Sequence, residues 1–559
     1  MHSGTPWRGV SRWLAIATTA LSTAAFGHSA MFPDGFKYDD SNEGPTAAQL
    51  RQKARLAGQP LAPAGVCSGG SADGYPCSKV DLQAFVPKAL LGGGTNNLND
   101  IWGWTDPLTG AEIAIVGRTN GTAFVDVSAP ATPVLLGFLP SHNGGVDSWR
   151  DIKVYADHAF IVADGGGNST HGLQVYDLRQ LRGIAPGGTL TETAHLGSFG
   201  AAHNIAINED SGYAYVVGSN RCSGGLYMID ISSPQAPAYA GCFSADGYTH
   251  DAQCVIYAGP DAAYAGREVC MAYNEDTITV VDVTDKANPI QLSRTPYAGS
   301  RYTHQGWFLD GNHATIIVND ELDESATGAN TTSYIFDVSD LDHPTEIGRY
   351  TGPTRAIDHN LYTRDGYVFE TNYRAGLRIL DASAIASGSL SEVAYFDTVP
   401  GSDAASFSGT WSSYVYFPSG NIVLSDIGSG LFVVKPDWDA IGGGGGSVFE
   451  NLTPVEIPDR SLAGATSAIE VTRAGAAGTV QVSVDIVHTA IGQLIVDVIT
   501  PTGTVHNLHR LSGGRADDLH ETYAVDAGAT DAAGTWTLRV RDVLRRQTGT
   551  LSGWRITFP

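Results

Sequence analysis

The sequence predicts an all-β protein, a seven-bladed β-propeller followed by a β-sandwich, and three observations lead to this fold class. The 559 residues include 67 glycines and only 16% charged residues, which is typical of short strands joined by glycine-rich turns. An apolar segment that ends in Asp recurs along the chain. Beyond residue 447 this repeat gives way to longer stretches in which apolar and polar residues alternate, as in a sheet with one buried face.

The N-terminus has the layout of a secretory signal peptide. Arg8 and Arg12 precede the apolar run WLAIATTALSTAAFG, and small residues follow it. Cleavage is expected after Gly27 or Ala30, so residues 1–27 are assigned to the signal. The run is shorter than the roughly 20 residues that a membrane span requires, and no span is expected after the signal is removed. The mature chain is expected to be secreted by a bacterium, to the periplasm or the exterior.

The six cysteines form three neighbouring couples, which predict disulfides in an exported protein. None belongs to a CxxC motif of the kind that holds zinc, although other pairings stay open. The expected disulfides are Cys67–Cys77, Cys222–Cys242 and Cys254–Cys270. The first of them closes a loop within an N-terminal extension, residues 28–79.

Internal repetition defines the propeller, residues 80–438. The repeated segments end at markers spaced about 45 to 55 residues apart, a period that fits four-stranded blades and not short solenoid repeats. The markers are Asp126, Asp177, Asp230, Asp282, Asp337, Asp381 and, in a seventh segment, Lys435. Each marker therefore identifies one blade.

The seventh blade lacks its last strand. A further strand follows each of the first six markers, whereas Lys435 leads into a Gly-rich linker, residues 439–447. The segment DLQAFVPKALLGGG, ahead of the first blade, imitates LLGFLPSHNGG but has no blade of its own. Residues 80–88 are therefore expected to close the seventh blade, which removes two exposed strand edges.

The stretches after the linker predict a separate β-sandwich, residues 448–559. They read VQVSVDIVHTAIGQLIVDVITPTGT and GTWTLRVRDVLRRQTGTLSGWRITF. Their HT-x-IG-x-L, P-x-GT and GTW-x-L-x-V-x-D elements resemble the P domain (Homo B domain) that follows the catalytic domain of subtilisin-like proprotein convertases. The resemblance implies a jelly-roll-like sandwich and an association with serine peptidases.

The propeller resembles LVIVD-repeat, choice-of-anchor B type secreted bacterial proteins, through its apolar strands that end in Asp and its His-led strands. A subtilisin-like catalytic domain is missing, because the part ahead of the P-like region consists of blades and contains no serine-nucleophile turn or HGT element. The SGTWSS segment, residues 408–413, opens the last blade instead. No catalytic residue is therefore assigned.

Polar or aromatic residues open the first strand of every blade. The innermost strand of a blade lines the central channel, so residues at its start face one mouth of the channel from successive blades. These residues are Asp100, Asp151, His203, His250, His304, His359 and Trp411. The histidines are expected to form an arc.

Acidic residues are expected in loops at the same mouth, in the segments YNEDT and NDELDE. Imidazole with carboxylate suits Zn²⁺, whereas carboxylate and carbonyl oxygens alone suit Ca²⁺. The predicted ligands of such a divalent cation are His203, His250, Asp251, His304, His359, Glu275 and Asp320. Hydrogen bonding of the backbone where strands converge is the alternative role of these residues.

The sequence favours a secreted binding module whose channel mouth holds a metal ion or a small ligand, with the P-like domain as an accessory. Its partner would be an extracellular protein, a glycan or a small ligand, since the net charge of -25 disfavours nucleic acid and anionic membrane surfaces. Two alternatives stay open. The histidine arc could serve a metal-dependent hydrolase or lyase with Asp251 or Glu275 as base, and the P-like domain could indicate a peptidase-associated role.

Overall fold

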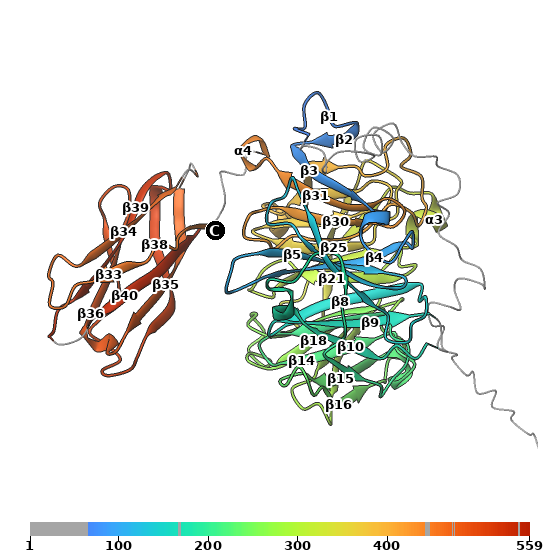
Figure 1. The fold of residues 1–559 in the computed structure, drawn as a ribbon, viewed down its shortest axis with the longest axis horizontal. Coiled ribbons are helices and arrows are strands. Elements are labelled where there is room, and N and C mark those ends of the chain that lie inside the picture. Colours follow the sequence, from blue (N-terminus) through green and yellow to red (C-terminus); the bar gives the residue numbers. More distant parts are fainter. Residues whose placement is uncertain are drawn as a thin grey trace, which may run out of the picture.

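The computed structural model shows a seven-bladed β-propeller and a β-sandwich, as the sequence predicts (Figure 1). The structure describes residues 65–165, 169–441, 448–471, 473, 476–545 and 548–558. The expected signal peptide lies outside these ranges, as do most of the N-terminal extension and residues 442–447 of the linker. In the described ranges, no helix has the length and apolar character needed to cross a membrane.

Each blade is an antiparallel sheet with a core of four strands. Strands are given from first to last in each blade. Blade 1 contains β4 (Leu98–Thr105), β5 (Glu112–Arg118), β6 (Gly121–Asp126) and β7 (Val134–Pro140), and blade 2 contains β8 (Trp149–Tyr155), β9 (His158–Asp164), β10 (Leu173–Asp177) and β12 (Ala194–Leu196). Blade 3 contains β13 (Asn204–Asn208), β14 (Tyr213–Val217), β15 (Leu226–Asp230) and β16 (Ala238–Phe243), and blade 4 contains β17 (Asp251–Ile256), β18 (Glu268–Tyr273), β19 (Ile278–Asp282) and β20 (Ile290–Thr295).

Blade 5 contains β21 (Thr303–Phe308), β22 (Thr315–Asp320), β23 (Thr332–Asp337) and β24 (Thr345–Thr351), and blade 6 contains β25 (Asn360–Arg364), β26 (Tyr367–Thr371), β27 (Leu377–Asp381) and β28 (Ser391–Phe396). Blade 7 contains β29 (Thr410–Tyr414), β30 (Ile422–Asp426), β31 (Gly430–Pro436) and β3 (Val80–Pro87). A short strand, β11 (Gly188–Thr189), adds to blade 1 beside β7. Short helices lie between the strands: η1 (Lys88–Leu90), η2 (Leu178–Leu181), η3 (Cys222–Gly224), α3 (Asp323–Thr327), η4 (Ile385–Ser387) and α4 (Trp438–Ile441).

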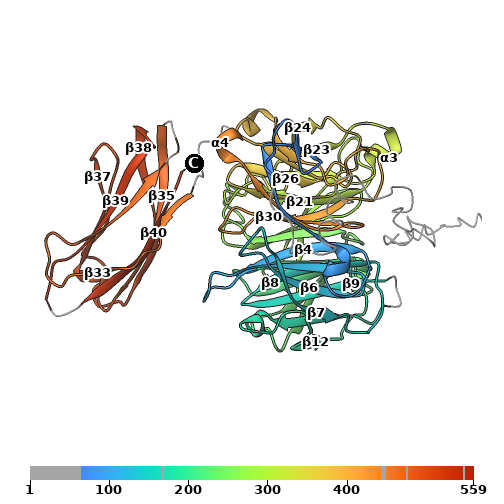
Figure 2. The same ribbon diagram turned by 45° about the horizontal axis from the view of Figure 1, so that its top comes forward.

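The middle strands are buried on both faces because neighbouring blades pack face to face. Every residue of β5, β9 and β18 is buried, whereas β24, a fourth strand, is mostly exposed. Figure 2 shows β4, β6 and β7 following one another from the middle of the propeller to its edge. Burial on two faces explains why these segments read as nearly continuous apolar runs rather than as alternating ones.

The Asp that ends each repeated segment closes a turn after the third strand. The side chain of Asp126 accepts the backbone N–H of Ser128 (2.9 Å), and Asp337 accepts that of Ser339 (2.8 Å) in the same way. The corresponding Asp residues of blades 2, 3, 4 and 6 make the same contact to the residue two positions on. An Asx-type turn of this kind is the physical reason for the repeat.

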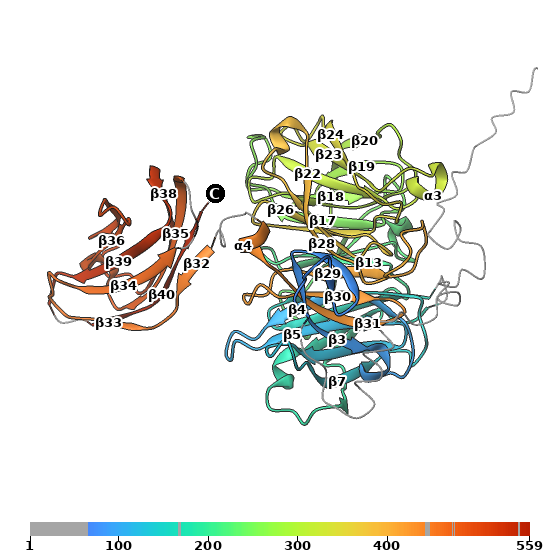
Figure 3. The same ribbon diagram turned by 90° about the horizontal axis from the view of Figure 1, so that it is seen from above.

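The propeller is a closed ring. First strands of neighbouring blades contact one another all the way round: β4–β8, β8–β13, β13–β17, β17–β21, β21–β25, β25–β29 and β29–β4. In blade 7, β3 pairs antiparallel with β31, from Val80 opposite Pro436 to Pro87 opposite Gly430 (Figure 3, blue beside orange). Segments from both ends of the propeller sequence therefore complete one blade, which pairs their edges.

The described end of the N-terminal extension adds to blade 6. There β2 (Tyr75–Ser78) pairs with β28, and β1 (Ser71–Ala72) pairs with β2. This pairing with blade 6 was not expected from the sequence. The three predicted disulfides are confirmed as Cys67–Cys77, Cys222–Cys242 and Cys254–Cys270.

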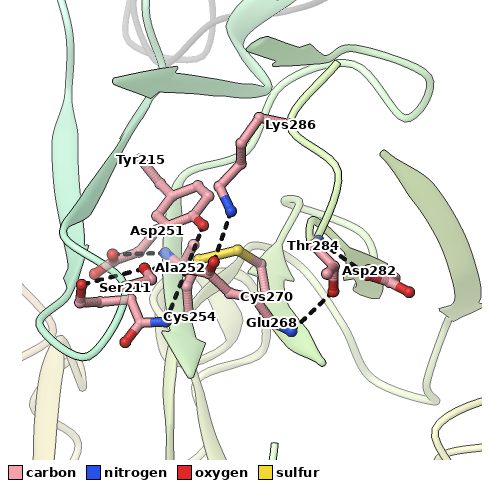
Figure 4. The surroundings of a disulfide bond; sticks show 11 residues. Ser211, Tyr215, Asp251, Ala252, Cys254, Glu268, Cys270, Asp282, Thr284 and Lys286 are labelled. Carbon is pink, nitrogen blue, oxygen red and sulfur yellow. Dashed lines mark hydrogen bonds and ion pairs between the residues drawn. A yellow bond between two sulfur atoms is a disulfide. The ribbon is translucent and has the colours of Figure 1, made fainter. Parts of the chain in front are cut away.

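Buried polar groups also connect blades, and Figure 4 shows one example beside the Cys254–Cys270 disulfide. Glu268 of blade 4 accepts hydrogen bonds from Ser211 Oγ (2.6 Å) and Tyr215 OH (2.6 Å) of blade 3. The ammonium of Lys286 lies 2.6 Å from its other oxygen. The carboxylate is therefore buried with its charge and hydrogen bonds satisfied.

The C-terminal part is a two-sheet sandwich. One sheet has the order β32 (Val448–Asn451), β40 (Gly549–Thr557), β35 (Ala476–His488), β38 (Leu519–Asp531), with β33 (Val455–Ile457) also on β40. The other has the order β34 (Ala465–Val471), β39 (Gly534–Asp542), β36 (Leu494–Ile499), β37 (Val505–Arg510), and η5 (Ile491–Gln493) precedes β36. Buried and exposed residues alternate strictly along β34, and Trp536 and Trp554 lie in the core between the sheets.

Candidate functional site

Histidines at the channel end of blades 4, 5 and 6 form a hydrogen-bonded ladder. His250 Nδ1 donates to the carbonyl of His304 (2.9 Å), and His304 Nδ1 donates to the carbonyl of His359 (3.0 Å). His359 Nδ1 donates in turn to the carbonyl of Trp411 in blade 7 (2.6 Å). Because a carbonyl oxygen can only accept, each Nδ1 carries the ring proton and the neutral ring keeps its lone pair on Nε2.

Glu321, just beyond the end of β22, lies between two of these rings. Its Oε2 is 3.7 Å from His304 Nε2, and its Oε1 is 3.8 Å from His359 Nε2. These distances exceed those of hydrogen bonds. The side chains of His304, Glu321 and His359 are only 1%, 3% and 4% exposed, and one ligand atom of each lies within 4.8 Å of the others. Two imidazoles and a carboxylate therefore converge in a buried space.

The electrostatics of this group follow from burial. Burial raises the pKa of Glu321 to about 8, although the hydroxyl of Tyr373, which donates to Oε1 (2.7 Å), acts in the opposite direction. Burial lowers the pKa of His359 to about 3, so this ring is neutral near pH 7. The other oxygen of Glu321, Oε2, is buried without a hydrogen-bond partner. Without a metal ion, Glu321 is therefore largely protonated near pH 7, and a cation that binds here must displace this proton.

The other predicted ligands lie outside this group. His203 Nδ1 is 3.4 Å from Asp164 Oδ2, and Asp251 accepts the N–H of Ala252 (2.7 Å). The carbonyl of Glu275 accepts the N–H of Thr303, which joins the loop after β18 to β21. Asp320 accepts three hydrogen bonds, from Arg301 N (2.7 Å), Tyr302 N (2.8 Å) and Tyr297 OH (3.1 Å). Among the seven predicted ligands, His304 and His359 converge with Glu321. The rings of the four predicted histidines also contact one another in series, with centroids 4.0–4.5 Å apart: His203, His250, His304 and His359.

Within NDELDE, Glu321 converges with the histidines, whereas the predicted ligand Asp320 accepts hydrogen bonds from Arg301 N and Tyr302 N. Asp320 ends β22 and Glu321 follows it, so their side chains leave the strand on opposite sides. The alternation of an extended chain was the signal that could have separated the two residues. Which of them faces the histidines depends on the packing of blade 5 against blade 6.

A buried lysine, Lys153 of β8, lies beside the acidic residues that open blades 1 and 2 and was not expected from the sequence. Its ammonium lies 2.7 Å from Asp151 Oδ1 and 3.5 Å from Asp100 Oδ2, and 4.7 Å from the ring centre of Trp102. The acidic residues that open blades 1 and 2 are therefore partners of a buried cation of the protein itself. Burial raises the pKa of Asp251, and Lys153 opposes this, leaving it at about 7.

Comparisons with known proteins fit this two-part organisation. Residues 199–244 match the LVIVD repeat, and residues 477–558 match the proprotein convertase P-domain. Among curated relatives, the leupeptin-inactivating enzyme 1 of Streptomyces exfoliatus is 45% identical over 115 residues, which is 20% of this chain and 26% of that protein. The transglutaminase-activating metalloprotease of Streptomyces mobaraensis is 45% identical over 123 residues, or 22% and 16%. The chain thus spans about a quarter and a sixth of these relatives.

Two solved structures show distant likenesses. A protein from Lactobacillus plantarum aligns over 59% of this chain and 88% of its own, with 13% identity and a TM-score of 0.38. The complex of an Aeromonas sobria serine protease with its chaperone aligns over 25% and 32%, with 17% identity and a TM-score of 0.17. The fold rests on the strand pairing described above and not on these alignments. The chain joins a β-propeller that contains an LVIVD repeat to a C-terminal proprotein convertase P-domain.

Proposed function

We propose that this chain is a secreted binding protein whose propeller holds one first-row divalent metal ion, of which Zn²⁺ is the best fit, between His304, Glu321 and His359. The observation that carries the proposal is the convergence of three buried electron-pair donors at distances too long for hydrogen bonds. The P-domain serves as an accessory in this proposal, and the three disulfides suit an oxidising compartment.

The dimensions support a zinc-class ion. Ligand atoms placed about 2.0–2.2 Å from a tetrahedral zinc ion lie about 3.3–3.6 Å from one another. The distances of 3.7 and 3.8 Å end on different oxygens of Glu321, and one ligand atom of each residue lies within 4.8 Å of the others. The ligand atoms must therefore approach one another by at most about 1.5 Å to reach tetrahedral spacing. Each histidine also donates its Nδ1 proton to a carbonyl, which orients the ring with Nε2 toward Glu321.

A binding role accounts for the surroundings of the site better than catalysis does. Three protein ligands leave at least one coordination position, which water or another small ligand could fill. The three side chains are almost completely buried, so a substrate has little access to them. The segments shared with the two Streptomyces enzymes are too short to transfer a peptidase activity to this chain.

Metal analysis of purified protein tests the proposal. Elemental analysis should find about one equivalent of a first-row metal per chain, and His304→Ala and His359→Ala should lose it. Added Zn²⁺ at about 100 times its dissociation constant should stabilise the wild type by about 2.7 kcal/mol. His343→Ala is the control, because this histidine is 79% exposed and contacts only Asp340 in its own turn.

Three results would overturn the proposal. Protein with less than about 0.1 equivalents of metal and no thermal shift on adding it would leave the histidines as backbone hydrogen-bond donors. Metal retained equally in His304→Ala and His359→Ala would place the ion elsewhere. Metal-dependent turnover of a peptide, ester or lyase substrate, abolished in both variants, would replace the binding role with an enzymatic one.

A further inference from the structure

A second group of acidic side chains lies buried between blades 5 and 6. Asp323 and Glu324 begin α3, in the connection from β22 to β23, and Asp358 lies just ahead of β25. One carboxylate oxygen of each residue lies within 4.8 Å of the others. The three residues are 5%, 1% and 0% exposed. This carboxylate cluster shares no residue with the group of His304, Glu321 and His359.

Most oxygens of the carboxylate cluster are buried without a hydrogen-bond partner. This holds for both oxygens of Asp358, both oxygens of Glu324 and Oδ1 of Asp323. The remaining oxygen, Oδ2 of Asp323, accepts a hydrogen bond from Tyr334 OH (3.1 Å). Asp358 is completely buried, and neither of its oxygens is satisfied. Native proteins rarely leave such a group without a partner, so Asp358 points to a ligand independently of the acidity of the cluster.

The surrounding charges make the arrangement more costly. Asp358 is completely buried, and its carboxylate lies beside those of Asp323 and Glu324, which carry the same charge when ionised. Three carboxylates at this spacing need either protons or a cation to offset their repulsion and their loss of water.

An all-oxygen environment indicates a hard cation. Ca²⁺ takes six to eight oxygen ligands and accepts carboxylates in one- or two-oxygen contacts, whereas Zn²⁺ prefers nitrogen or sulfur with fewer ligands. We propose that Asp323, Glu324 and Asp358 bind one Ca²⁺ ion, which links α3 of blade 5 to the start of blade 6. The cluster offers six carboxylate oxygens for this purpose. The inference does not depend on the proposed zinc-class site, although Glu321 and His359 are close in sequence to its ligands.

Another acidic group supplies a matched control. Oxygens of Asp261, Asp340 and Asp342 also lie within 4.8 Å of one another, but this group is largely exposed. Its oxygens have hydrogen-bond partners as well, since Leu341 N donates to Asp261 (3.1 Å) and Tyr264 OH donates to Asp342 (2.8 Å). Similar spacing without burial or unsatisfied oxygens is not expected to hold a cation tightly.

The test uses full-length wild type, Asp358→Asn and Asp342→Asn, each treated with a chelator. Ca²⁺ binding is measured by calorimetric titration, and stability is measured by thermal melting with and without Ca²⁺. Wild type and Asp342→Asn should bind about one Ca²⁺ in the cluster and melt at a higher temperature with it. Asp358→Asn should bind Ca²⁺ at least about tenfold more weakly, a loss of about 1.4 kcal/mol. Without Ca²⁺, this variant should melt at or above the wild-type temperature, because one repelling charge is gone.

Further measurements keep the inference testable if Asp358→Asn does not fold. Glu324→Gln should give the same loss, and Tb³⁺ bound to the wild type should show luminescence sensitised by Tyr334, whose hydroxyl contacts Asp323. Excess Ca²⁺ should abolish that signal. His304→Ala should retain the Ca²⁺ response, which separates this site from the zinc-class site. A wild type that gains no stability from Ca²⁺, or a gain unchanged in Asp358→Asn and Glu324→Gln, would overturn the inference in favour of shared protons.

Discussion

At the scale of single residues, buried carboxylates of this protein differ in what offsets their charge. Asp106 receives two hydrogen bonds from Arg182, at 2.6 and 2.9 Å, and further ones from Leu108 N and Thr109 Oγ1. The hydrogen bond from Arg182 is the main reason why the pKa of Asp106 lies well below its usual value. The pKa of Glu321 is instead raised to about 8, because burial of its carboxyl outweighs the hydrogen bond that Tyr373 donates to it.

Asp106 should therefore make stability depend on pH. A lowered pKa in the folded state means that the carboxylate stabilises the protein above its unfolded pKa of about 3.9, and that this contribution is lost as the pH falls toward the folded value. Asp106→Asn, which keeps a side-chain oxygen for the turn, is expected to lower the melting temperature at pH 7. The difference from the wild type should shrink when both proteins are melted at about pH 3.

The exposed pair of Arg364 and Asp365 provides the control for this prediction. Their side chains are 30% and 34% exposed at a separation of 3.0 Å, so Asp365→Asn should change stability by less than about 1 kcal/mol. A destabilisation by Asp106→Asn that stays constant from pH 7 to 3 would show that the lost interaction is not electrostatic.

At the scale of elements, a small residue recurs beside a bulge in the fourth strand of the blades. The register between third and fourth strands shifts by one residue in blades 1, 3, 4, 5 and 6. The fourth-strand residue paired just before each shift is Gly137, Gly241, Ser293, Gly348 or Ala394. A Cβ at Gly241 would lie 1.8 Å from the carbonyl oxygen of Lys286 in blade 4. The small residue therefore lets one blade approach the backbone of the next.

Gly241→Ala should destabilise the propeller. The added methyl must displace the backbone at Lys286, and overpacking of this kind costs about 1–3 kcal/mol. Chemical denaturation monitored by tryptophan fluorescence measures the loss. Gly311→Ala is the control, because its Cβ would meet nothing within 4 Å. Equal stability of the two variants would mean that blades 3 and 4 can separate slightly without cost, and the packing explanation would be wrong.

At the scale of the whole molecule, the propeller and the sandwich have separate cores. The sandwich core contains only residues from Ile457 to Phe558, and the propeller clusters among the described residues contain none beyond Ile441. The segment between them includes residues 442–447, which lie outside the described ranges. Its sequence, GGGGGS directly after Ile441, is that of a flexible linker.

Limited proteolysis should cut first between Ile441 and Val448, because a Gly-rich linker lacks the burial and pairing that protect strands. The two fragments should remain folded, and calorimetry of the intact chain should show two transitions. The isolated fragment from Val448 onward should reproduce one of them. One shared transition together with first cuts elsewhere would show that the two parts fold as a single cooperative unit.

The sequence by itself determined the architecture, because each blade repeats the same local pattern. This pattern consists of apolar strands, a turn closed by Asp and a period set by four strands. The cysteine couples were likewise predictable from sequence proximity, and the P-domain from its motifs. Part of the candidate site was predictable too, since His304 and His359 occupy equivalent places in the repeat.

Only the tertiary structure decided which side chains meet across blades. Glu321 rather than Asp320 faces the histidines, Lys153 neutralises the acidic residues of blades 1 and 2, and Asp358 joins the carboxylates of α3. Apart from Asp151 and Lys153, which share β8, the partners in these contacts come from different strands or loops, and local periodicity fixes the side of a strand but not the neighbour that it meets. The stacking of the blades sets the distances between these side chains. It therefore also sets which charges lie near each buried group and how they shift its pKa.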